Sequence, residues 1–316
     1  MKAIYKTIGI SLAASVVGLM FSFGVRGVAS VRAKGEKGAL NFFIVSDWGW
    51  NGFKAQQEVA DQMARSAEKI EPGFVVSCGH NFQVSGVASV QDPLWLTNFE
   101  YVYKSVYLQC DWYPVLGNHD YRGNTQAQID YSRISRRWRF ESRYYTFVRR
   151  VNDSVSARFI FLDTSPFVTD YYHKPGMPDI PQQDTAAQVA WLRDVLANSK
   201  EKWKLVFGHH PVLSGGKTHG STPELIERFK PLFDKYHVQV YFCGHDHDLQ
   251  HLRGGSVDYI VTGTGGEPRP TGKIAQTLYS ASMPAFSTVS LWADSIRVRF
   301  VDSKGNVQYT MKRAYR

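Results

Sequence analysis

Residues 238–247 read VQVYFCGHDH, an apolar run that ends in a glycine followed by two alternating histidines. A continuous run of Val, Tyr and Phe is typical of a strand buried on both faces of a sheet. Alternate residues of an extended segment face the same way, so the two imidazoles share one side. We therefore expect a buried strand that delivers a pair of histidines at its carboxyl end.

Four further apolar runs end in groups that bind metals, and three of them do so beside a glycine. They are NFFIVSD (41–47), FVVSCGH (74–80), WYPVLGNHD (112–120) and WKLVFGHH (203–210). Another strand is expected at 157–164, helices at 55–70, 186–199 and 223–236, a strand at 258–263 and β-hairpins over 287–312. Alternating strands and helices indicate an α/β fold, in which ligands bind beyond the carboxyl ends of the strands.

The donor types at these strand ends indicate a metal site. Each motif alone is weak, because an Asp-x-Gly turn or a buried histidine is usually structural. Together, Asp, Asn and His donors suit Zn, Mn or Fe and suit Ca poorly, since calcium prefers oxygen ligands. The donors are too many for one tetrahedral ion, so two adjacent ions are the natural interpretation.

The order of the motifs carries a resemblance to a known family. The chain has Asp-x-Gly (47–49), Gly-x-Asn (79–81), Gly-Asn-His-Asp (117–120), Gly-His-x-Pro-Val (208–212) and Gly-His-Asp-His (244–247). This order is similar to that of the calcineurin-like metallophosphoesterases, and 112–138 and 241–250 resemble the purple, or tartrate-resistant, acid phosphatases. The resemblance covers residues 41–253. It implies an α/β fold of four layers, an α/β/β/α sandwich with two central mixed sheets flanked by helices.

The resemblance also implies a dinuclear centre and a set of site residues. The implied metal ligands are Asp47, His80, Asn118, His209, His245 and His247, with Asp47 and His247 on the first ion and Asn118, His209 and His245 on the second. The implied catalytic residues are His119, near the substrate phosphate, and His219, which would bind phosphate or protonate the leaving group. A solvated loop histidine is the alternative for His219. His210 is expected to be a spare beside a ligand, and His173, His237 and His251 are expected to be surface or packing residues.

One loop departs from the family pattern. The family has Gly-Asp-Asn-Phe-Tyr where this chain has Gly-His-Asn-Phe-Gln at 79–83. A carboxylate has two oxygens and bridges two ions, whereas a neutral imidazole offers one lone pair to one ion. We therefore expect His80 to weaken one metal position and to leave a single tightly bound ion. Gln83 cannot act as a phenolate ligand, so we expect no purple colour and a preference for Zn, Mn or ferrous iron.

The amino terminus has the features of a targeting segment. Lys2 and Lys6 precede an apolar run over 8–25, and Val-Arg-Ala at 31–33 resembles a cleavage site. Residues 1–33 are thus expected to be a signal peptide or an N-terminal anchor, and residues 34–316 a single domain. The catalytic part would then be periplasmic, secreted or held at the cell envelope. Removing four basic residues lowers the formal charge from +9 to +5, a mildly basic balance that suits anionic substrates.

These observations lead to one functional hypothesis, one alternative and a weaker third option, an enzyme of the same fold that acts on diesters or nucleotides. The chain is expected to be an exported metal-dependent acid phosphatase, in which a metal-bound hydroxide attacks the phosphorus of a phosphomonoester. The alternative is a degenerate homologue that binds phosphate or metal with weak or no catalysis. The expected partner is a small phosphorylated substrate, with no nucleic acid, no membrane beyond the N-terminal segment and a monomeric state. Cys78, Cys110 and Cys243 are an odd number, which excludes a complete intrachain disulfide framework.

Overall fold

The computed structural model describes residues 38–315, so the expected targeting segment 1–33 lies outside the described part. The described chain forms two β-sheets, and each combines parallel and antiparallel strands. The six-stranded sheet has the order β13-β12-β11-β1-β2-β3. Its strands are β1 (Leu40–Val45), β2 (Phe74–Ser77), β3 (Asp111–Pro114), β11 (Ala285–Leu291), β12 (Ser295–Asp302) and β13 (Val307–Ala314).

The second sheet has seven strands in the order β10-β8-β9-β7-β6-β5-β4. They are β4 (Tyr145–Arg150), β5 (Ser156–Phe161), β6 (Trp203–Phe207), β7 (Val240–Cys243), β8 (Leu249–Gly254), β9 (Val257–Thr262) and β10 (Thr277–Ala281). β1, β2 and β3 are parallel in the first sheet, and β5, β6, β7 and β9 are parallel in the second. The carboxyl ends of neighbouring parallel strands lie at the same edge of their sheet, where loops collect polar groups.

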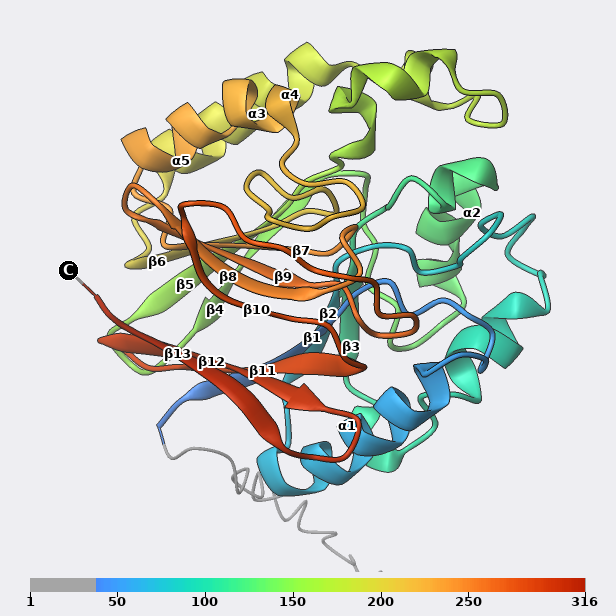
Figure 1. The fold of residues 1–316 in the computed structure, drawn as a ribbon, viewed down its shortest axis with the longest axis horizontal. Helices are drawn as coiled ribbons and strands as arrows, with labels where there is room; N and C mark the ends of the chain where they lie inside the picture. Colours follow the sequence, from blue (N-terminus) through green and yellow to red (C-terminus); the bar gives the residue numbers. More distant parts are fainter. Residues whose placement is uncertain (1–37, 316) are drawn as a thin grey trace, which may run out of the picture. The chain divides into compact units, whose positions relative to one another are not determined.

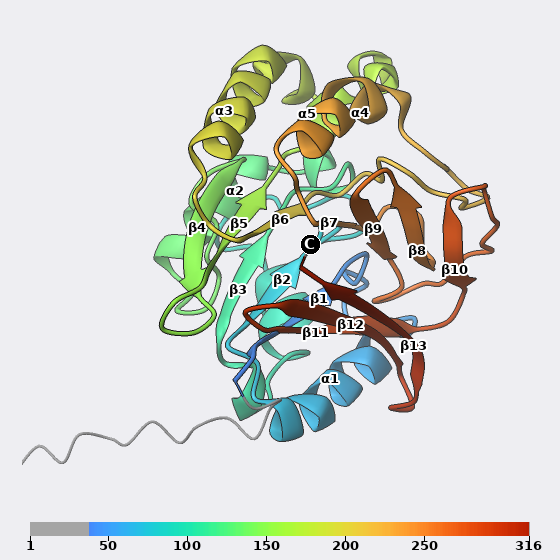
Figure 2. The same ribbon diagram turned by 90° about the vertical axis from the view of Figure 1, so that its left-hand side faces the viewer.

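Helices cover the outer faces of both sheets. They are α1 (Gln56–Ile70), α2 (Thr125–Asp130), α3 (Thr185–Asn198), α4 (Pro223–Arg228) and α5 (Lys230–Lys235). Short helical turns span Trp95–Glu100, Val106–Leu108, Asp120–Arg122, Tyr131–Arg133, Ser165–Phe167, Thr169–His173 and Ile180–Gln182. In Figures 1 and 2, α3, α4 and α5 lie over the seven-stranded sheet, and α1 lies on the far side of the six-stranded sheet. The predicted four-layer α/β/β/α sandwich is confirmed.

The two sheets are held together by an aromatic core. Phe42 on β1 stacks on Phe74 of β2 at 4.8 Å between ring centroids. Its other contacts reach the opposite sheet, where Phe159 lies at 5.5 Å and Phe207 at 6.4 Å. Burying a phenylalanine stabilises the fold by about 1.5–3 kcal/mol. A second cluster, which includes Leu192 of α3, fills the space between the seven-stranded sheet and α3–α5.

The structure corrects the sequence prediction in two places. The single helix expected at 223–236 is two short helices, because Pro231 lacks the N–H that would continue the hydrogen bonding from α4 into α5. The strands β4, β8 and β10 were not predicted. β4 and β10 lie at the two edges of their sheet, and half-exposed edge strands lack the continuous apolar run of a central strand.

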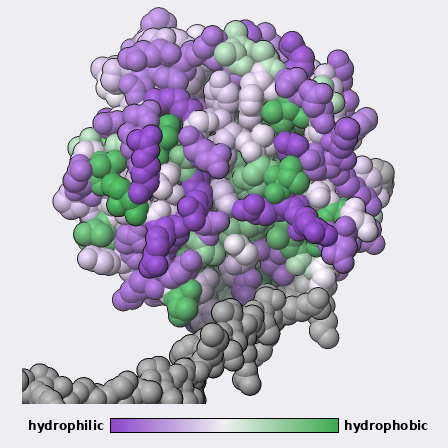
Figure 3. Space-filling model, turned by 180° about the vertical axis from the view of Figure 1, so that it is seen from behind, coloured by the Kyte–Doolittle hydropathy of each residue, from purple (hydrophilic) through white to green (hydrophobic). Residues whose placement is uncertain are grey.

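Hydrophobic groups on the face shown in Figure 3 are separated by hydrophilic side chains. None of the helices within 38–315 is long and apolar enough to cross a membrane. All three cysteines are free thiols, and Cys78 and Cys243 are buried.

Candidate metal centre

The ligands predicted from separate strand ends come together in one cluster, and they come from both sheets. Asp47 and His80 follow β1 and β2 of the six-stranded sheet, whereas His209 and His245 follow β6 and β7 of the other. Two groups of side chains are close enough to hold an ion, with all ligand atoms of a group within 4.8 Å of one another. One group is Asp47, His80 and His247, and the other is His80, His209 and His245.

His80 lies at the centre of the cluster and belongs to both groups. Its Nδ1 lies 2.5 Å from Asp47 Oδ1, and its Nε2 lies 2.7 Å from Asn118 Oδ1. The contact with Asp47 has the distance of an ion pair but lacks the alignment of a hydrogen bond. The His80 ring is 4.0 Å from that of His209 and 4.5 Å from that of His119, between centroids. The imidazole therefore connects the side chains expected to hold the first ion with those expected to hold the second.

Backbone carbonyl groups orient two of the other histidines. His209 Nδ1 is 2.8 Å from the Cys78 carbonyl oxygen, and His247 Nδ1 is 2.8 Å from the Glu267 carbonyl oxygen. A ring that donates its Nδ1–H to a carbonyl presents the lone pair of Nε2, as metal-binding histidines usually do. His209 Nε2 is buried and has no hydrogen-bond partner among the described residues. The second ring nitrogen of His209 is thus oriented for an ion.

Asp47 supplies the negative charge of the cluster. Its Oδ2 accepts a hydrogen bond from the His245 backbone N–H at 3.0 Å, and its Oδ1 lies 3.4 Å from His247 Nε2. Burial raises the pKa of the Asp47 carboxyl, but the charges of His80 and His247 outweigh burial and hold it well below its usual range. Burial lowers the pKa of His209 and His245 well below the usual value, with neighbouring histidines adding to the effect. Both rings are therefore neutral, which is the form that binds metals.

Backbone strain is concentrated in this cluster. Asp47, His80 and His245 have positive φ angles of 57°, 51° and 68°. Non-glycine residues seldom adopt this region, and such strain tends to occur at functional sites. Gly79 has φ 90°, and a Cβ there would come within 2.6 Å of His209 Nδ1. Only glycine therefore fits between β2 and the His209 ring.

The two predicted catalytic histidines lie beside the cluster. Burial, with a further contribution from His80, lowers the pKa of His119 to about 2. His119 Nδ1 is buried without a hydrogen-bond partner in the described chain. The His219 ring stacks on His245 with centroids 4.0 Å apart and an angle of 28° between the planes. His219 is therefore next to the site, and its side chain is also exposed to solvent.

The remaining histidines lie outside the candidate ligand set. His210 uses both ring nitrogens in hydrogen bonds, with Thr164 Oγ1 at 2.8 Å and with the Tyr171 hydroxyl at 3.0 Å. His251 is buried between Tyr309 and Asp258. The other two, His173 and His237, are exposed.

Two buried acids in the site motifs have roles that the sequence analysis did not assign. Asp120 accepts hydrogen bonds from the backbone N–H groups of Gly117 at 2.8 Å and Phe82 at 3.1 Å. It therefore joins the loop after β3 to the loop after β2. Asp246 accepts hydrogen bonds from Ser214 Oγ at 2.5 Å and from the His219 N–H at 3.0 Å. Their position in the sequence could have revealed these roles, since each acid directly follows a histidine of the site.

The donor set fits one ion well, but it fits two ions only if they share a ligand. An ion at either group would use a nitrogen of His80, because both groups contain it. If His80 binds an ion on one side, the group on the other side keeps its two remaining His or Asp donors, to which Asn118 adds an amide oxygen on the side of His209 and His245. The unpartnered Nε2 of His209 and the carbonyl-oriented ring of His247 indicate that at least one ion is accommodated.

A sandwich of two mixed sheets, with a histidine and aspartate cluster at the carboxyl ends of parallel strands, defines a metal-dependent phosphoesterase. The chain belongs to the calcineurin-like phosphoesterase family, which matches residues 40–249. Its curated relatives are purple and tartrate-resistant acid phosphatases, which are phosphoric monoester hydrolases.

Three relatives illustrate the similarity. Purple acid phosphatase 7 of Arabidopsis thaliana is 33% identical over 87% of this chain and 86% of its own length. Tartrate-resistant acid phosphatase type 5 of Homo sapiens is 32% identical over 86% of this chain and 90% of its own. The solved structure described as GAP50, the anchor in the inner membrane complex of Plasmodium, superposes with a TM-score of 0.77. It is 25% identical and covers 88% of this chain and 89% of its own.

Proposed function

We propose that the protein is an exported, metal-dependent acid phosphatase that hydrolyses small phosphomonoesters. The observation that carries the proposal is the buried cluster around His80, in which His209 presents an unpartnered Nε2 and His247 is oriented by a carbonyl group. A histidine with one ring nitrogen bonded to a carbonyl group and the other left without a partner is typical of metal ligands. The acid phosphatase activity named for the relatives supports the same reaction.

Each residue would have a defined task in this reaction. Asp47 and His247, and Asn118, His209 and His245, would hold metal on the two sides of His80. A bound ion acidifies water and neutralises charge on the phosphoryl oxygens. His119, held neutral by burial, would donate an N–H hydrogen bond to a phosphoryl oxygen. His219 stacks on His245 beside the site, where it would bind phosphate or give a proton to the leaving group.

We further propose that the resting protein holds one ion tightly. His80 replaces the bridging carboxylate of the family, and its two nitrogens contact Asp47 and Asn118. With one carboxylate in the cluster, the site favours Zn, Mn or ferrous iron over ferric iron. Gln83 supplies no phenolate, so an iron-loaded protein would lack the purple absorption band.

A second candidate is a homologue that binds phosphate or metal without turnover. The observation in its favour is that both ion-binding groups depend on His80, so the loss of the second ion would slow the reaction severely. GAP50, which has the same fold, is described as the anchor in the inner membrane complex of Plasmodium. Metal content and turnover separate the two candidates.

Hydrolysis of 4-nitrophenyl phosphate by the full chain tests the first candidate. Turnover that chelation abolishes, that a divalent ion restores and that His209→Ala removes supports the enzyme. The exposed His173→Ala is the matched control and should keep full activity. Absence of turnover with Zn, Mn and Fe(II) alike, combined with retained phosphate binding, would favour the second candidate.

Export and domain organisation form a separate part of the proposal. Residues 1–33 would be a signal peptide or anchor, and residues 34–316 a single domain that acts in the periplasm, at the envelope or outside the cell. Mass spectrometry of protein recovered from the envelope and medium tests this. A mature chain that begins near residue 34 supports cleavage, full-length membrane-bound protein supports an anchor, and cytoplasmic recovery contradicts export.

A further inference from the structure

A basic cavity of about 480 Å³ lies at the edge of the sheets opposite the metal centre. The metal ligands follow the carboxyl ends of β6 and β7, whereas the cavity is lined at the amino ends of β6, β7 and β9 and at the end of β13. Its volume is within the usual range for small-molecule sites. Its lining contains no acid and four residues that carry a full positive charge, namely Lys204, Arg253, Lys312 and Arg313.

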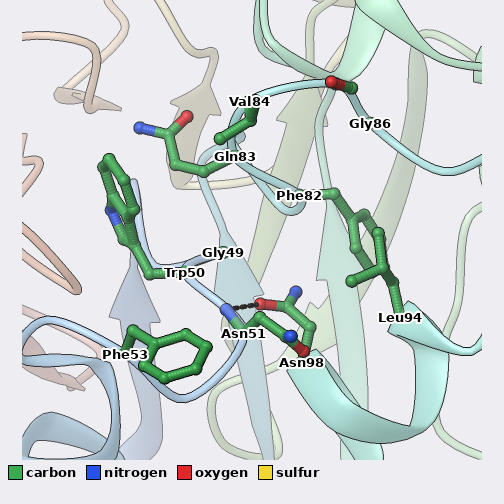
Figure 4. A pocket seen from close by; sticks show the side chains of 11 residues that line it. Gly49, Trp50, Asn51, Phe53, Phe82, Gln83, Val84, Gly86, Leu94 and Asn98 are labelled. Atoms are coloured by element: carbon green, nitrogen blue, oxygen red, sulfur yellow. Dashed lines mark hydrogen bonds between the residues drawn. The ribbon is translucent and has the colours of Figure 1, made fainter.

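This charge is not a general property of the hollows in the described chain. Another cavity, of about 350 Å³ beside Gln83, is lined by residues from 49–53, 82–86 and 94–98 (Figure 4). None of its lining residues is charged, and apolar side chains such as Phe53 and Leu94 form much of its wall. The four cations around the basic cavity are therefore a specific feature of the amino edge.

The basic groups of the cavity outnumber the acids that could neutralise them. The buried Asp258 carboxylate accepts hydrogen bonds from Arg253 Nε at 2.8 Å and from Arg313 Nη1 at 2.9 Å. One carboxylate thus faces two guanidinium groups. Asp234 of α5 lies beside the turn between β8 and β9, but its carboxylate is already paired with Lys230 Nζ at 2.7 Å. A positive charge therefore remains even where the arginines are paired.

The two lysines add charge that no acid within 38–315 pairs with. Lys312 is exposed and Lys204 is half-buried, and neither ammonium group has an ion-pair or hydrogen-bond partner among the described residues. Burial lowers the pKa of Lys204, and the charge of Glu201 offsets this only in part. Glu201 itself binds Arg158 at 2.8 Å. A half-buried ammonium group without a counter-charge is unfavourable, and a bound anion would supply that charge.

The amino-terminal segment joins the domain at this same edge. Leu40, the first residue of β1, pairs with Leu291 of β11. Leu291 pairs with Ile296, which pairs with Arg313 of the cavity. Three strand spacings, about 14 Å in all, therefore separate the start of β1 from Arg313. The chain that carries the apolar run over 8–25 thus enters the domain at the basic edge.

We propose that the basic cavity binds the phosphate headgroup of an anionic phospholipid and holds the amino edge of the domain against the membrane. An apolar segment and a basic cluster are two signals that together give stable membrane association. The headgroup phosphate supplies the counter-charge that Lys204 and Lys312 lack, and it accepts hydrogen bonds from the guanidinium groups of Arg253 and Arg313. The metal centre then faces away from the membrane. This role goes beyond the proposed phosphatase function, and it depends on the proposed export for its setting.

Flotation of the full chain with phosphatidylcholine vesicles, with and without phosphatidylglycerol, tests the proposal. The ratio of the two affinities reports the charged contact, because an apolar segment contributes equally to both. Lys204→Gln combined with Lys312→Gln should lower this ratio about 30-fold, since each basic residue near an anionic surface contributes about fivefold. The matched control is Lys217→Gln combined with Lys273→Gln, which removes the same charge from two exposed residues. Both control residues lie by the loop after the carboxyl end of β6, so the control should keep the native ratio.

Three results would overturn the proposal. They are the absence of a preference for phosphatidylglycerol, an unchanged ratio in the cavity variant, and an equal loss in the cavity variant and the control. Calorimetry with inorganic phosphate identifies the source of the anion. A phosphate site that the cavity variant loses, without any preference for phosphatidylglycerol, would show that the cavity binds a free anion and would overturn the lipid assignment.

Two further measurements separate this proposal from the others. The melting temperature of the cavity variant should match that of the native chain, which shows that the variant folds. Hydrolysis of 4-nitrophenyl phosphate should be unchanged in the cavity variant, because the cavity and the metal centre lie at opposite ends of β6. If no phosphomonoester is hydrolysed by the native chain, the proposed function fails, while the vesicle measurement still decides what the cavity binds.

Discussion

Replacing His80 by aspartate should convert a site for one tightly held ion into a site for two. The reason is that a carboxylate has two oxygens, one for each side of the cluster, whereas the imidazole joins Asp47 and Asn118 directly. The native chain should contain about one metal ion and the variant about two when both are saturated, as expected when the bridging ligand is restored.

The size of the effect follows from charge and distance. Both nitrogens of His80 lie within 2.7 Å of candidate ligand atoms, so a carboxylate there would be about 4 Å or less from either ion. A unit charge 4 Å from a divalent ion contributes about 8 kcal/mol at an effective dielectric constant of 20. Desolvating the new carboxylate costs several kcal/mol. A net gain of about 3 kcal/mol would tighten the second ion about 100-fold.

The assay combines elemental analysis, calorimetric titration with Zn or Mn, and hydrolysis of 4-nitrophenyl phosphate. His80→Asn is the matched control, because asparagine has the shape of aspartate without its charge. The variant His80→Asp should also be less stable without metal, since two carboxylates would face each other across the contact with Asp47. Its melting temperature should therefore rise more on metal addition than that of the native chain.

Two results would refute this reasoning. If His80→Asp binds no more metal than His80→Asn, charge at this position does not limit the second ion. If the native chain already holds two ions with similar affinity, His80 does not restrict the centre, and the single-ion proposal is wrong.

Three other variants test separate parts of the structure. Asp246→Asn should lower kcat/KM for a phosphomonoester about tenfold and leave the metal content unchanged. The reason is that the loop bearing His219 loses the charged group that accepts its hydrogen bonds. Loss of metal in this variant would instead show that Asp246 belongs to the metal centre. Phe42→Ala should lower the free energy of unfolding, measured in urea, by about 3–5 kcal/mol, because the ring contacts both sheets. A decrease below about 1 kcal/mol would contradict the position of Phe42 in the core. Burial raises the pKa of Asp163 to about 7, so the folded protein favours the protonated carboxyl. The stability that this protonated group contributes is complete below about pH 4 and is lost as the pH rises through 7. The unfolding free energy of the native chain should fall up to about 4 kcal/mol more than that of Asp163→Asn between pH 4 and 8, and equal pH profiles would show that Asp163 keeps an ordinary pKa.

The convergence of the site was predictable because each strand end carries its own local signal. Glycine followed by histidine or asparagine after an apolar run marked residues near Asn118, His209 and His245, and the structure brings them together. The sequence did not reveal that the ligands come from two different sheets. Strand order depends on pairing between segments far apart in the chain, such as β1 with β11.

Contacts made by individual side chains were beyond sequence reasoning. His210 and His209 are adjacent and chemically identical, yet only the structure shows that Thr164 and Tyr171 occupy both nitrogens of His210. The cavity beside Gln83 was also unpredicted, because its walls come from three separate segments. Such features depend on tertiary packing, which leaves no periodic pattern in the sequence.

The most direct test of the central claim is a metal titration of the purified chain, followed simultaneously by calorimetry and by hydrolysis of 4-nitrophenyl phosphate. We predict that turnover appears as the first ion binds and that both signals disappear in His209→Ala. Saturable metal binding without any hydrolysis, or hydrolysis that persists in a strong chelator, would contradict a phosphatase that works through ions held by this histidine cluster.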